Sequence, residues 1–281
     1  MISGVILQTV DALLLADNLS FVIVANSLPF GDSGCMTCYM PLRSLLVVLL
    51  SCLPVWSFAQ SDSYALQRIL QRYTEAYGGF RDADALSSLS VEGTIEQNGQ
   101  SFDFLMRKKR PYSFRYRLSN EWSRVVTGYN GKEAWLRSES QGQATIRELD
   151  EEETRDLRVL ARFDSPLFRA LEEGDDDISF LERSTLNDRS VYVLAVEQRE
   201  RGLCHYFVDV ITAHVVRVDQ FDLSGELQLQ ILYRDYREVD GFPFAHEIET
   251  RLGDERLSLA KVDEIEVNPG LLSFYFEKPI H

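Results

Sequence analysis

Residues 89–106 read LSVEGTIEQNGQSFDFLM, and this stretch decides the fold. From Leu89 to Ile95 every second residue is apolar or glycine, which is the period of a strand with one buried face. Asn98-Gly99 follows, a pair typical of two-residue hairpin turns because both positions need a positive φ. Beyond the turn, three apolar side chains share one face: Phe102, Phe104 and Met106. The stretch therefore predicts a β-hairpin with one apolar and one polar face.

The same alternation continues through most of the chain. The strands expected after the hairpin cover residues 112–118, 122–129, 133–138, 177–185, 190–198, 203–210, 214–221, 226–236, 244–252 and 257–267. We expect about eleven strands in all. Polar outer faces and tight turns are typical of an antiparallel sheet that faces water on one side.

Three segments have helical spacing instead. Residues 62–77 carry apolar side chains three and four positions apart, and Gly78-Gly79 ends the pattern. Two short amphipathic pieces, 150–163 and 165–173, lie between the two blocks of strands. One continuous sheet with helices on one face is the simplest arrangement of these elements, so we expect an α+β fold.

Residues 40–59 have the order of a signal peptide. Arg43 gives a short basic region, residues 45–50 form an apolar run, and a small-x-small site ends at Ala59. The apolar run is too short to span a bilayer comfortably. We therefore expect export to the periplasm, with cleavage after Ala59.

The residues around this segment divide the chain further. Residues 1–39 contain no Lys or Arg, and we interpret them as an upstream extension from a misplaced start codon, with translation starting at Met40. Residues 60–281 then form one domain. The alternative to cleavage is a poor lipobox that ends at Cys52 and would anchor the protein through a lipid on that residue.

Composition excludes several classes of function. The chain of 281 residues is 45% hydrophobic and has a formal net charge of −15, which argues against nucleic acid and anionic membrane surfaces as partners. No nucleophile-elbow, zinc-protease or phosphate-loop motif occurs. Three histidines in expected strands match no metal-ligand spacing: His205, His214 and His246. We expect no metal, no cofactor, no catalytic residue and no enzymatic activity.

Several motifs together resemble the LolA/LolB-like superfamily of outer-membrane lipoprotein-sorting proteins. A helix leads into the hairpin and its aromatic strand, and further motifs follow in the family's order: Lys109–Arg115 with its Arg-Pro and Phe-Arg pairs, Tyr129–Trp135, Val239–Pro243, Val267–Pro269 and Phe274–Pro279. The resemblance covers residues 62–281. It implies an incomplete antiparallel β-barrel of about eleven strands, strongly curved, with helices covering the open side.

The resemblance also implies a function. Family members hold acyl chains in an apolar hollow, so we expect a periplasmic protein that binds the acyl chain of a lipid or lipoprotein for envelope transport or sorting. An inner-membrane export protein or an outer-membrane acceptor would be its protein partner, and we expect a monomer. An envelope-stress sensor with the same fold is the alternative, and a hydrolase is a weaker one. Fold alone does not decide between them.

Two groups of residues are expected to build the site. The cavity lining would consist of Phe102, Phe104, Met106, Phe114, Tyr116, Trp135, Leu229, Ile231 and Tyr233. The same residues are compatible with an ordinary core, which the alternation does not distinguish from a lining. The lid would consist of Arg110, Leu157, Leu160, Phe163, Phe168 and Leu171. The resemblance implies that Arg110 holds the lid by hydrogen bonds to exposed carbonyls.

Overall fold

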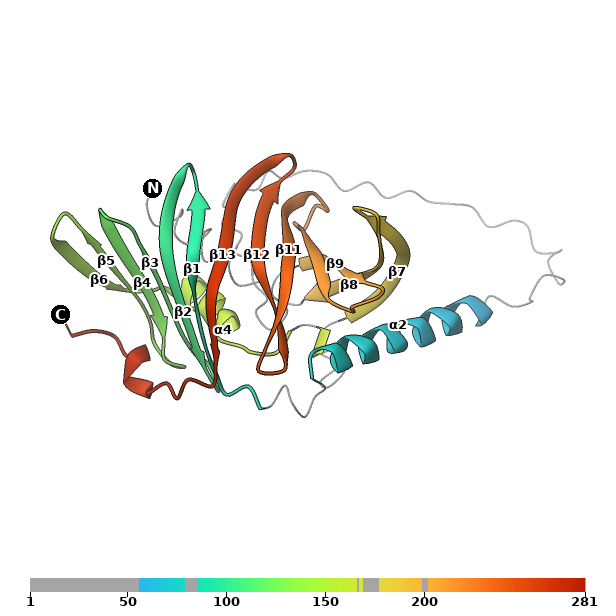
Figure 1. The fold of residues 1–281 in the computed structure, drawn as a ribbon, viewed down its shortest axis with the longest axis horizontal. Coiled ribbons are helices and arrows are strands. Elements are labelled where there is room, and N and C mark those ends of the chain that lie inside the picture. Colours follow the sequence, from blue (N-terminus) through green and yellow to red (C-terminus); the bar gives the residue numbers. More distant parts are fainter. Residues whose placement is uncertain (1–55, 79–84, 166, 169–176, 199–201, 281) are drawn as a thin grey trace, which may run out of the picture.

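The computed structural model describes residues 56–78, 85–165, 167–168, 177–198 and 202–280. Their strands form one 13-stranded antiparallel sheet in the order β6-β5-β4-β3-β2-β1-β13-β12-β11-β10-β9-β8-β7 (Figure 1). The bounds of the first six are Ser88–Gln97, Gln100–Lys109, Ser113–Ser119, Ser123–Tyr129, Ala134–Ser140 and Gln143–Glu148. Those of β7 to β13 are Asp177–Leu186, Arg189–Gln198, Gly202–Asp209, Val215–Phe221, Leu227–Val239, Phe242–Leu252 and Glu255–Val267. The predictions for residues 1–55 lie outside the described residues.

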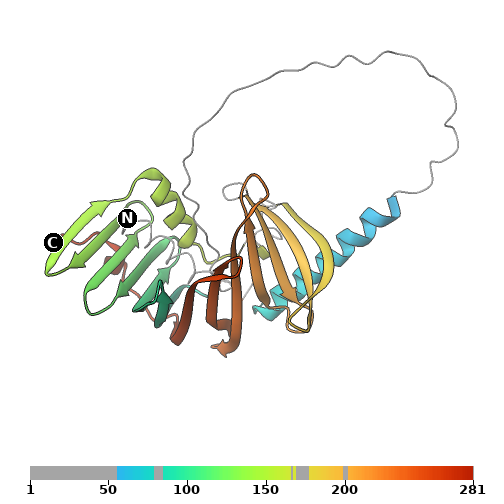
Figure 2. The same ribbon diagram turned by 90° about the horizontal axis from the view of Figure 1, so that it is seen from above.

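The sheet is open and curved, so the predicted incomplete barrel with helices is confirmed (Figure 2). It has more strands than expected, partly because the edge strand β6 was not predicted. Every side chain of β6 is exposed except the half-buried Ile146. An edge strand with little buried surface has no apolar alternation for a sequence pattern to detect. The predicted hairpin forms as expected, with φ of 50° at Asn98 and 71° at Gly99.

Two helices accompany the sheet. α2 covers Trp56–Ala76 and begins six residues before the predicted start at residue 62, so Ala59 lies within it. α4 covers Glu151–Leu160, where a capping box joins Asp150 to Glu153 and orders the first turn. It ends three residues before the predicted boundary. Of the second predicted piece, residues 167 and 168 are helical. Leu171 lies outside the described residues.

Both helices lie on the concave face, which we call the inner face. α2 packs on β7 and α4 packs on β4 and β5, so they lie beside opposite halves of the sheet (Figure 2). A single hydrophobic cluster nevertheless joins both halves, because inner-face residues of the central strands belong to it. The short 3-10 helix η1, Ser273–Phe276, follows β13 and packs on β3.

Asn268 ties the two halves together where β1 begins and β13 ends. Its Oδ1 accepts hydrogen bonds from the backbone N–H groups of Ser87 (2.8 Å) and Ser88 (3.1 Å). Its Nδ2 donates to the carbonyl of Ala85 at 3.0 Å, and its own N–H donates to Ser88 O at 2.9 Å. Asn268 has a φ of 55°, a conformation that asparagine tolerates better than most residues.

Replacement of Asn268 should therefore loosen the joint between β1 and β13. We expect Asn268→Ala to lower the free energy of unfolding by about 1–3 kcal/mol, because hydrogen bonds are lost and the positive φ is strained. Asn268→Gly removes the same hydrogen bonds without the strain, so it should lie between wild type and Asn268→Ala. Urea denaturation measures both. Wild-type stability in Asn268→Gly would contradict a structural role for the side chain.

Candidate functional site

The strand register places most of the predicted lining residues on the inner face. On β2 and β3, Met106 pairs with Tyr116 and Lys108 pairs with Phe114, and paired residues share a face. The rings of Phe104 and Tyr116 stack with their centroids 6.3 Å apart. All but one of the predicted lining residues are buried in the large hydrophobic cluster or, like Phe102 and Leu229, pack against it half-buried: Phe102, Phe104, Met106, Phe114, Tyr116, Leu229, Ile231 and Tyr233. Their role as a lining stays a prediction.

Trp135 is the exception, and it lies on the outer face. Its indole Nε1 donates to the carbonyl of Phe276 in η1 at 3.1 Å, so η1 covers its ring. Gly128 lies opposite it on β4, and a Cβ there would come within 2.3 Å of the ring. On β5 the inner-face residues are instead Ala134 and Leu136. The alternation alone offered no sign that a segment after the last strand covers the outer face.

The inner face also carries buried polar atoms that the protein does not satisfy. Among the described residues, no hydrogen-bond partner exists for Tyr116 Oη, Gln220 Oε1, Thr250 Oγ1 or Ser258 Oγ. Thr250 and Ser258 lie directly opposite each other on β12 and β13. An unsatisfied buried polar group costs about 1–3 kcal/mol. The sequence did not reveal these atoms, because Ser and Thr in a strand usually indicate the solvent-facing side.

A segment from α4 crosses the inner face to α2. We call the described residues 161–165 and 167–168 the crossing segment. Phe163 and Phe168 are buried in the large cluster, and the Phe168 ring lies 5.0 Å from that of Tyr73 in α2. Ser165 Oγ and Tyr73 Oη are hydrogen-bonded at 2.8 Å. The predicted lid residues Leu157 and Leu160 are buried in α4. The crossing segment therefore connects the two helices over the sheet.

Two cationic side chains at the end of β2 hold the crossing segment, and we call them the latch. Lys108 donates from Nζ to the carbonyl of Arg162, and its Nζ lies 4.9 Å from the centroid of the Phe163 ring. Arg110 donates from Nη2 to Asp164 Oδ1 at 3.0 Å and from Nε to Leu86 O at 2.9 Å. The Arg110 guanidinium lies 5.1 Å from the same ring.

The latch holds the crossing segment through two kinds of bond. Arg110 donates to the carboxylate of Asp164, and Lys108 donates to the main-chain carbonyl of Arg162. That Arg110 holds the segment through exposed carbonyls stays a prediction. Lys108 was missed because it lies in a run of basic residues, which usually indicates an exposed surface. Its position two residues after Met106 was the available signal, because alternation assigns both residues to the inner face.

Comparison with known proteins identifies the architecture. No protein-family model matches the sequence, and no curated protein matches it. A DUF1329 family protein from Desulfovibrio piger superposes with a TM-score of 0.55 at 11% identity, over 75% of this chain and 97% of that one. A LolA superfamily protein from Nitrosomonas europaea superposes with a TM-score of 0.52 at 14% identity, over 76% and 97%. This chain has a LolA-like fold.

Two of the histidines in this LolA-like chain, His205 and His214, pack against different aromatic rings. His214 stacks on Tyr236 with ring centroids 4.4 Å apart, and burial lowers its pKa. His205 contacts Phe221, and burial likewise lowers its pKa. Across the described ranges, no group of three or more His, Cys, Asp or Glu residues could hold a metal ion. No described helix is long and apolar enough to cross a membrane.

Lys108 of this LolA-like chain is unusual among lysines because it is fully buried. Its side chain has no exposed surface. Burial lowers the pKa of Lys108 well below its usual range, Asp164 partly offsets this effect, and Arg110 adds to it. An ammonium group buried in this way is stabilised by the Arg162 carbonyl and by the Phe163 ring. The buried positive charge of Lys108 therefore costs free energy in the folded state.

That cost predicts a pH dependence of stability. In the unfolded chain the pKa of Lys108 returns to about 10.4, so between the lowered folded pKa and that value the unfolded state binds more protons. Wild-type stability should therefore rise with pH in this alkaline window, relative to Lys108→Met, by up to about 1.4 kcal/mol per pH unit. Urea denaturation at a series of pH values measures the difference.

The control for this experiment is Lys132→Met, which removes the same charge from an exposed turn. It should follow the wild-type pH dependence more closely than Lys108→Met does. If Lys108→Met and wild type had parallel stability curves from neutral to alkaline pH, the buried lysine would not be the source of the effect.

Proposed function

We propose that this protein is an exported binding protein that holds the acyl chain of a lipid or lipoprotein against the inner face of its sheet. One observation carries the proposal. Aromatic and aliphatic side chains line that face, yet several of its buried polar atoms have no partner among the described residues. A completed core satisfies such atoms, whereas an interior that receives a ligand leaves them to water or to the ligand.

Burial of the acyl chain would supply the driving force. Each buried methylene contributes about 0.8 kcal/mol, so a sixteen-carbon chain gains on the order of 10 kcal/mol before entropic costs. Polar groups of the ligand, such as an ester, can accept hydrogen bonds from the hydroxyls of Thr250 and Ser258. Binding of this kind requires no catalytic group. The protein would act as a carrier.

The carrier would work in the periplasm. The signal-peptide order of residues 40–59 supports export, and the LolA-like fold supports a role in the cell envelope. Its cargo would be received from an export protein of the inner membrane or delivered to an acceptor at the outer membrane. The crossing segment would be the part that moves, because it can exchange its contacts with the sheet for those of the ligand.

Filling the inner face should block binding. Ser258 is buried on the inner face of β13, and Ser258→Phe would occupy space that the ligand needs. We expect at least a tenfold loss of affinity for a fluorescent fatty-acyl probe, measured by titration with delipidated protein. Thr94→Phe is the matched control, because Thr94 lies on the outer face of the adjacent strand β1, opposite Lys261. Its affinity should remain that of wild type.

A second variant tests whether a buried hydroxyl of the inner face is needed for stability or for binding of the apolar probe. Thr250→Val keeps the volume of the side chain and removes a buried hydroxyl that has no partner. The protein should remain as stable as wild type or become more stable by about 1 kcal/mol, and it should still bind the apolar probe. The outcome that would contradict the inner-face site comes from the first variant. If Ser258→Phe folded and bound the probe as wild type does, the inner face would not be the binding site.

The latch should control access to that face. Arg110→Leu removes the ion pair with Asp164. The side chain of Arg110 is 29% exposed and that of Asp164 is 41% exposed. Pairs this exposed contribute about 0–1 kcal/mol, so the melting temperature should fall by a few degrees at most. Hydrogen exchange in residues 155–165 should nevertheless become faster, as it should when wild type binds a ligand. Mass spectrometry of exchanged peptides measures both effects.

Arg237→Leu serves as the control, because Arg237 forms an exposed ion pair with Asp235 far from the crossing segment in sequence. It should leave exchange in residues 155–165 unchanged. Protection of these residues that depends on neither ligand nor Arg110 would mean that the segment is a permanent part of the core.

A further inference from the structure

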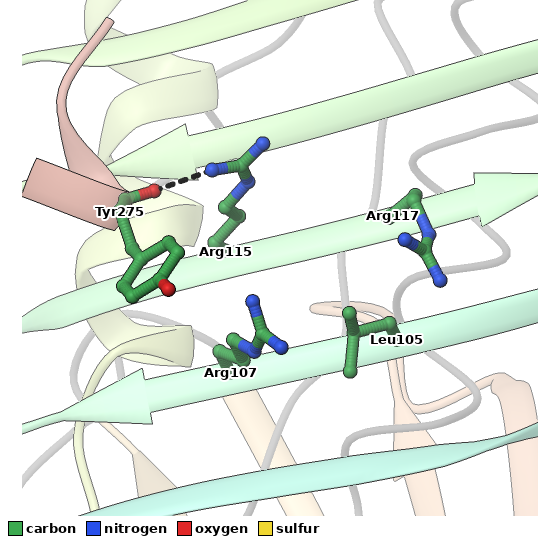
Figure 3. Close-up of a pocket in the computed structure, with 5 residues that line it drawn as sticks. All are labelled: Leu105, Arg107, Arg115, Arg117 and Tyr275. Carbon is green, nitrogen blue, oxygen red and sulfur yellow. Dashed lines mark hydrogen bonds between the residues drawn. The ribbon is translucent and has the colours of Figure 1, made fainter. Parts of the chain in front are cut away.

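A small pocket on the outer face of the sheet has no part in the proposed acyl site. Its volume is about 150 Å³, and its lining consists of Leu105, Arg107, Arg115, Arg117 and Tyr275 (Figure 3). Arg107 pairs with Arg115 and Leu105 pairs with Arg117 across β2 and β3. These residues alternate with Phe104 and Met106, so they point away from the inner face.

The arginines of this pocket lack acidic partners. Within the described part of the chain, Arg107, Arg115 and Arg117 form no ion pair with a carboxylate. A fourth arginine nearby on β5, Arg137, has only Glu139 at 3.9 Å. Some other arginines of the sheet are closely paired with carboxylates, as in the 2.6 Å contact of Arg234 with Glu249. Four arginines without close acidic partners therefore gather on the outer face of a chain whose net charge is −15.

The electrostatics of the cluster agree with its geometry. Burial lowers the pKa of Arg115, and the charges of Arg107, Arg117 and Arg137 lower it further. The buried Nε atoms of Arg107, Arg117 and Arg137 have no hydrogen-bond partner among the described residues. Like charges that repel one another, with donors left unsatisfied, are stabilised when an anion binds between them.

The residues around the cluster hold two of the guanidinium groups in place. Arg115 donates from Nη1 to the carbonyl of Tyr275 at 2.7 Å, and its guanidinium lies 5.7 Å from the Trp135 ring. Arg107 lies 5.2 Å from the centroid of the Tyr275 ring. Figure 3 shows Arg107 and Arg115 beside Tyr275, and Arg117 beside Leu105. Donors that are oriented before binding lose less entropy when they bind a ligand.

We propose that this pocket is a binding site for a phosphate-type oxyanion. The planar guanidinium fork matches the spacing of phosphate oxygens. The pocket is smaller than the roughly 300–1,000 Å³ of sites for drug-sized molecules, which suits a single phosphate group. The phosphate can come from free inorganic phosphate or from the headgroup of an anionic phospholipid, which offer the same chemistry. The site is independent of acyl binding on the inner face.

The experiment compares two sources of phosphate. Wild-type full-length protein is titrated with inorganic phosphate at constant ionic strength, with chloride as the reference, and its affinity is measured by calorimetry. Flotation with phosphatidylglycerol vesicles, against phosphatidylcholine vesicles, tests the headgroup. We expect saturable binding in one or both arms. Binding in the first arm alone assigns free phosphate as the source, and binding in the second assigns the headgroup.

Variants connect the binding to the pocket. Arg117→Gln should lower the affinity at least tenfold, and Arg117→Lys should lower it less because the charge is kept but the fork is lost. Among the described residues, no hydrogen bond or cation–π contact joins Arg117 to η1, so its replacement should leave the fold intact. Arg256→Gln is the control, since it removes the same charge from a distant outer-face position beside Glu96. It should bind as wild type.

Two results would overturn the proposal. The first is a wild-type protein that prefers neither phosphate to chloride nor phosphatidylglycerol to phosphatidylcholine. The second is equal loss of binding in Arg117→Gln and Arg256→Gln, which would indicate general charge attraction. In either case the arginine cluster would serve only to anchor the C-terminal segment through the carbonyl of Tyr275.

Discussion

The pairing of β1 with β13 is the constraint on which the rest of the structure depends. It joins strands from opposite ends of the described domain, whereas every other neighbour in the sheet is also a neighbour in sequence. Without it the chain would be two separate meanders, each with its own helix. The ordering of so long a connection has an entropic cost, which the long ladder and the bonds of Asn268 help to offset.

Once the two meanders share one sheet, its two faces acquire different chemistry. The inner face gathers the apolar side chains of both halves, and the crossing segment spans it between α4 and α2. Lys108 and Arg110 bind that segment from the end of β2. The outer face keeps the charged side chains, and η1 covers one part of it through Trp135. An acyl site and an anion site can therefore exist on one sheet without competing.

The candidate site could be predicted in part. Alternation correctly assigned Phe104, Met106 and Tyr116 to one face, because residues two apart in a strand point the same way. It did not assign Trp135, because β5 offers an apolar residue to either face and only η1 decides which is covered. Lys108 and Asp164 were missed because a buried charge depends on partners that are distant in sequence.

The sequence by itself determined most of the strands, the Asn98-Gly99 turn and the antiparallel character of the sheet. These depend on local properties: the two-residue period, and the positive φ that Asn98-Gly99 accepts at low cost. The tertiary structure alone decided what covers each face, which polar atoms remain without partners, and where the arginines of β2 and β3 meet. The physical reason is that periodicity defines which side chains share a face, whereas the packing against that face comes from segments far away in the chain.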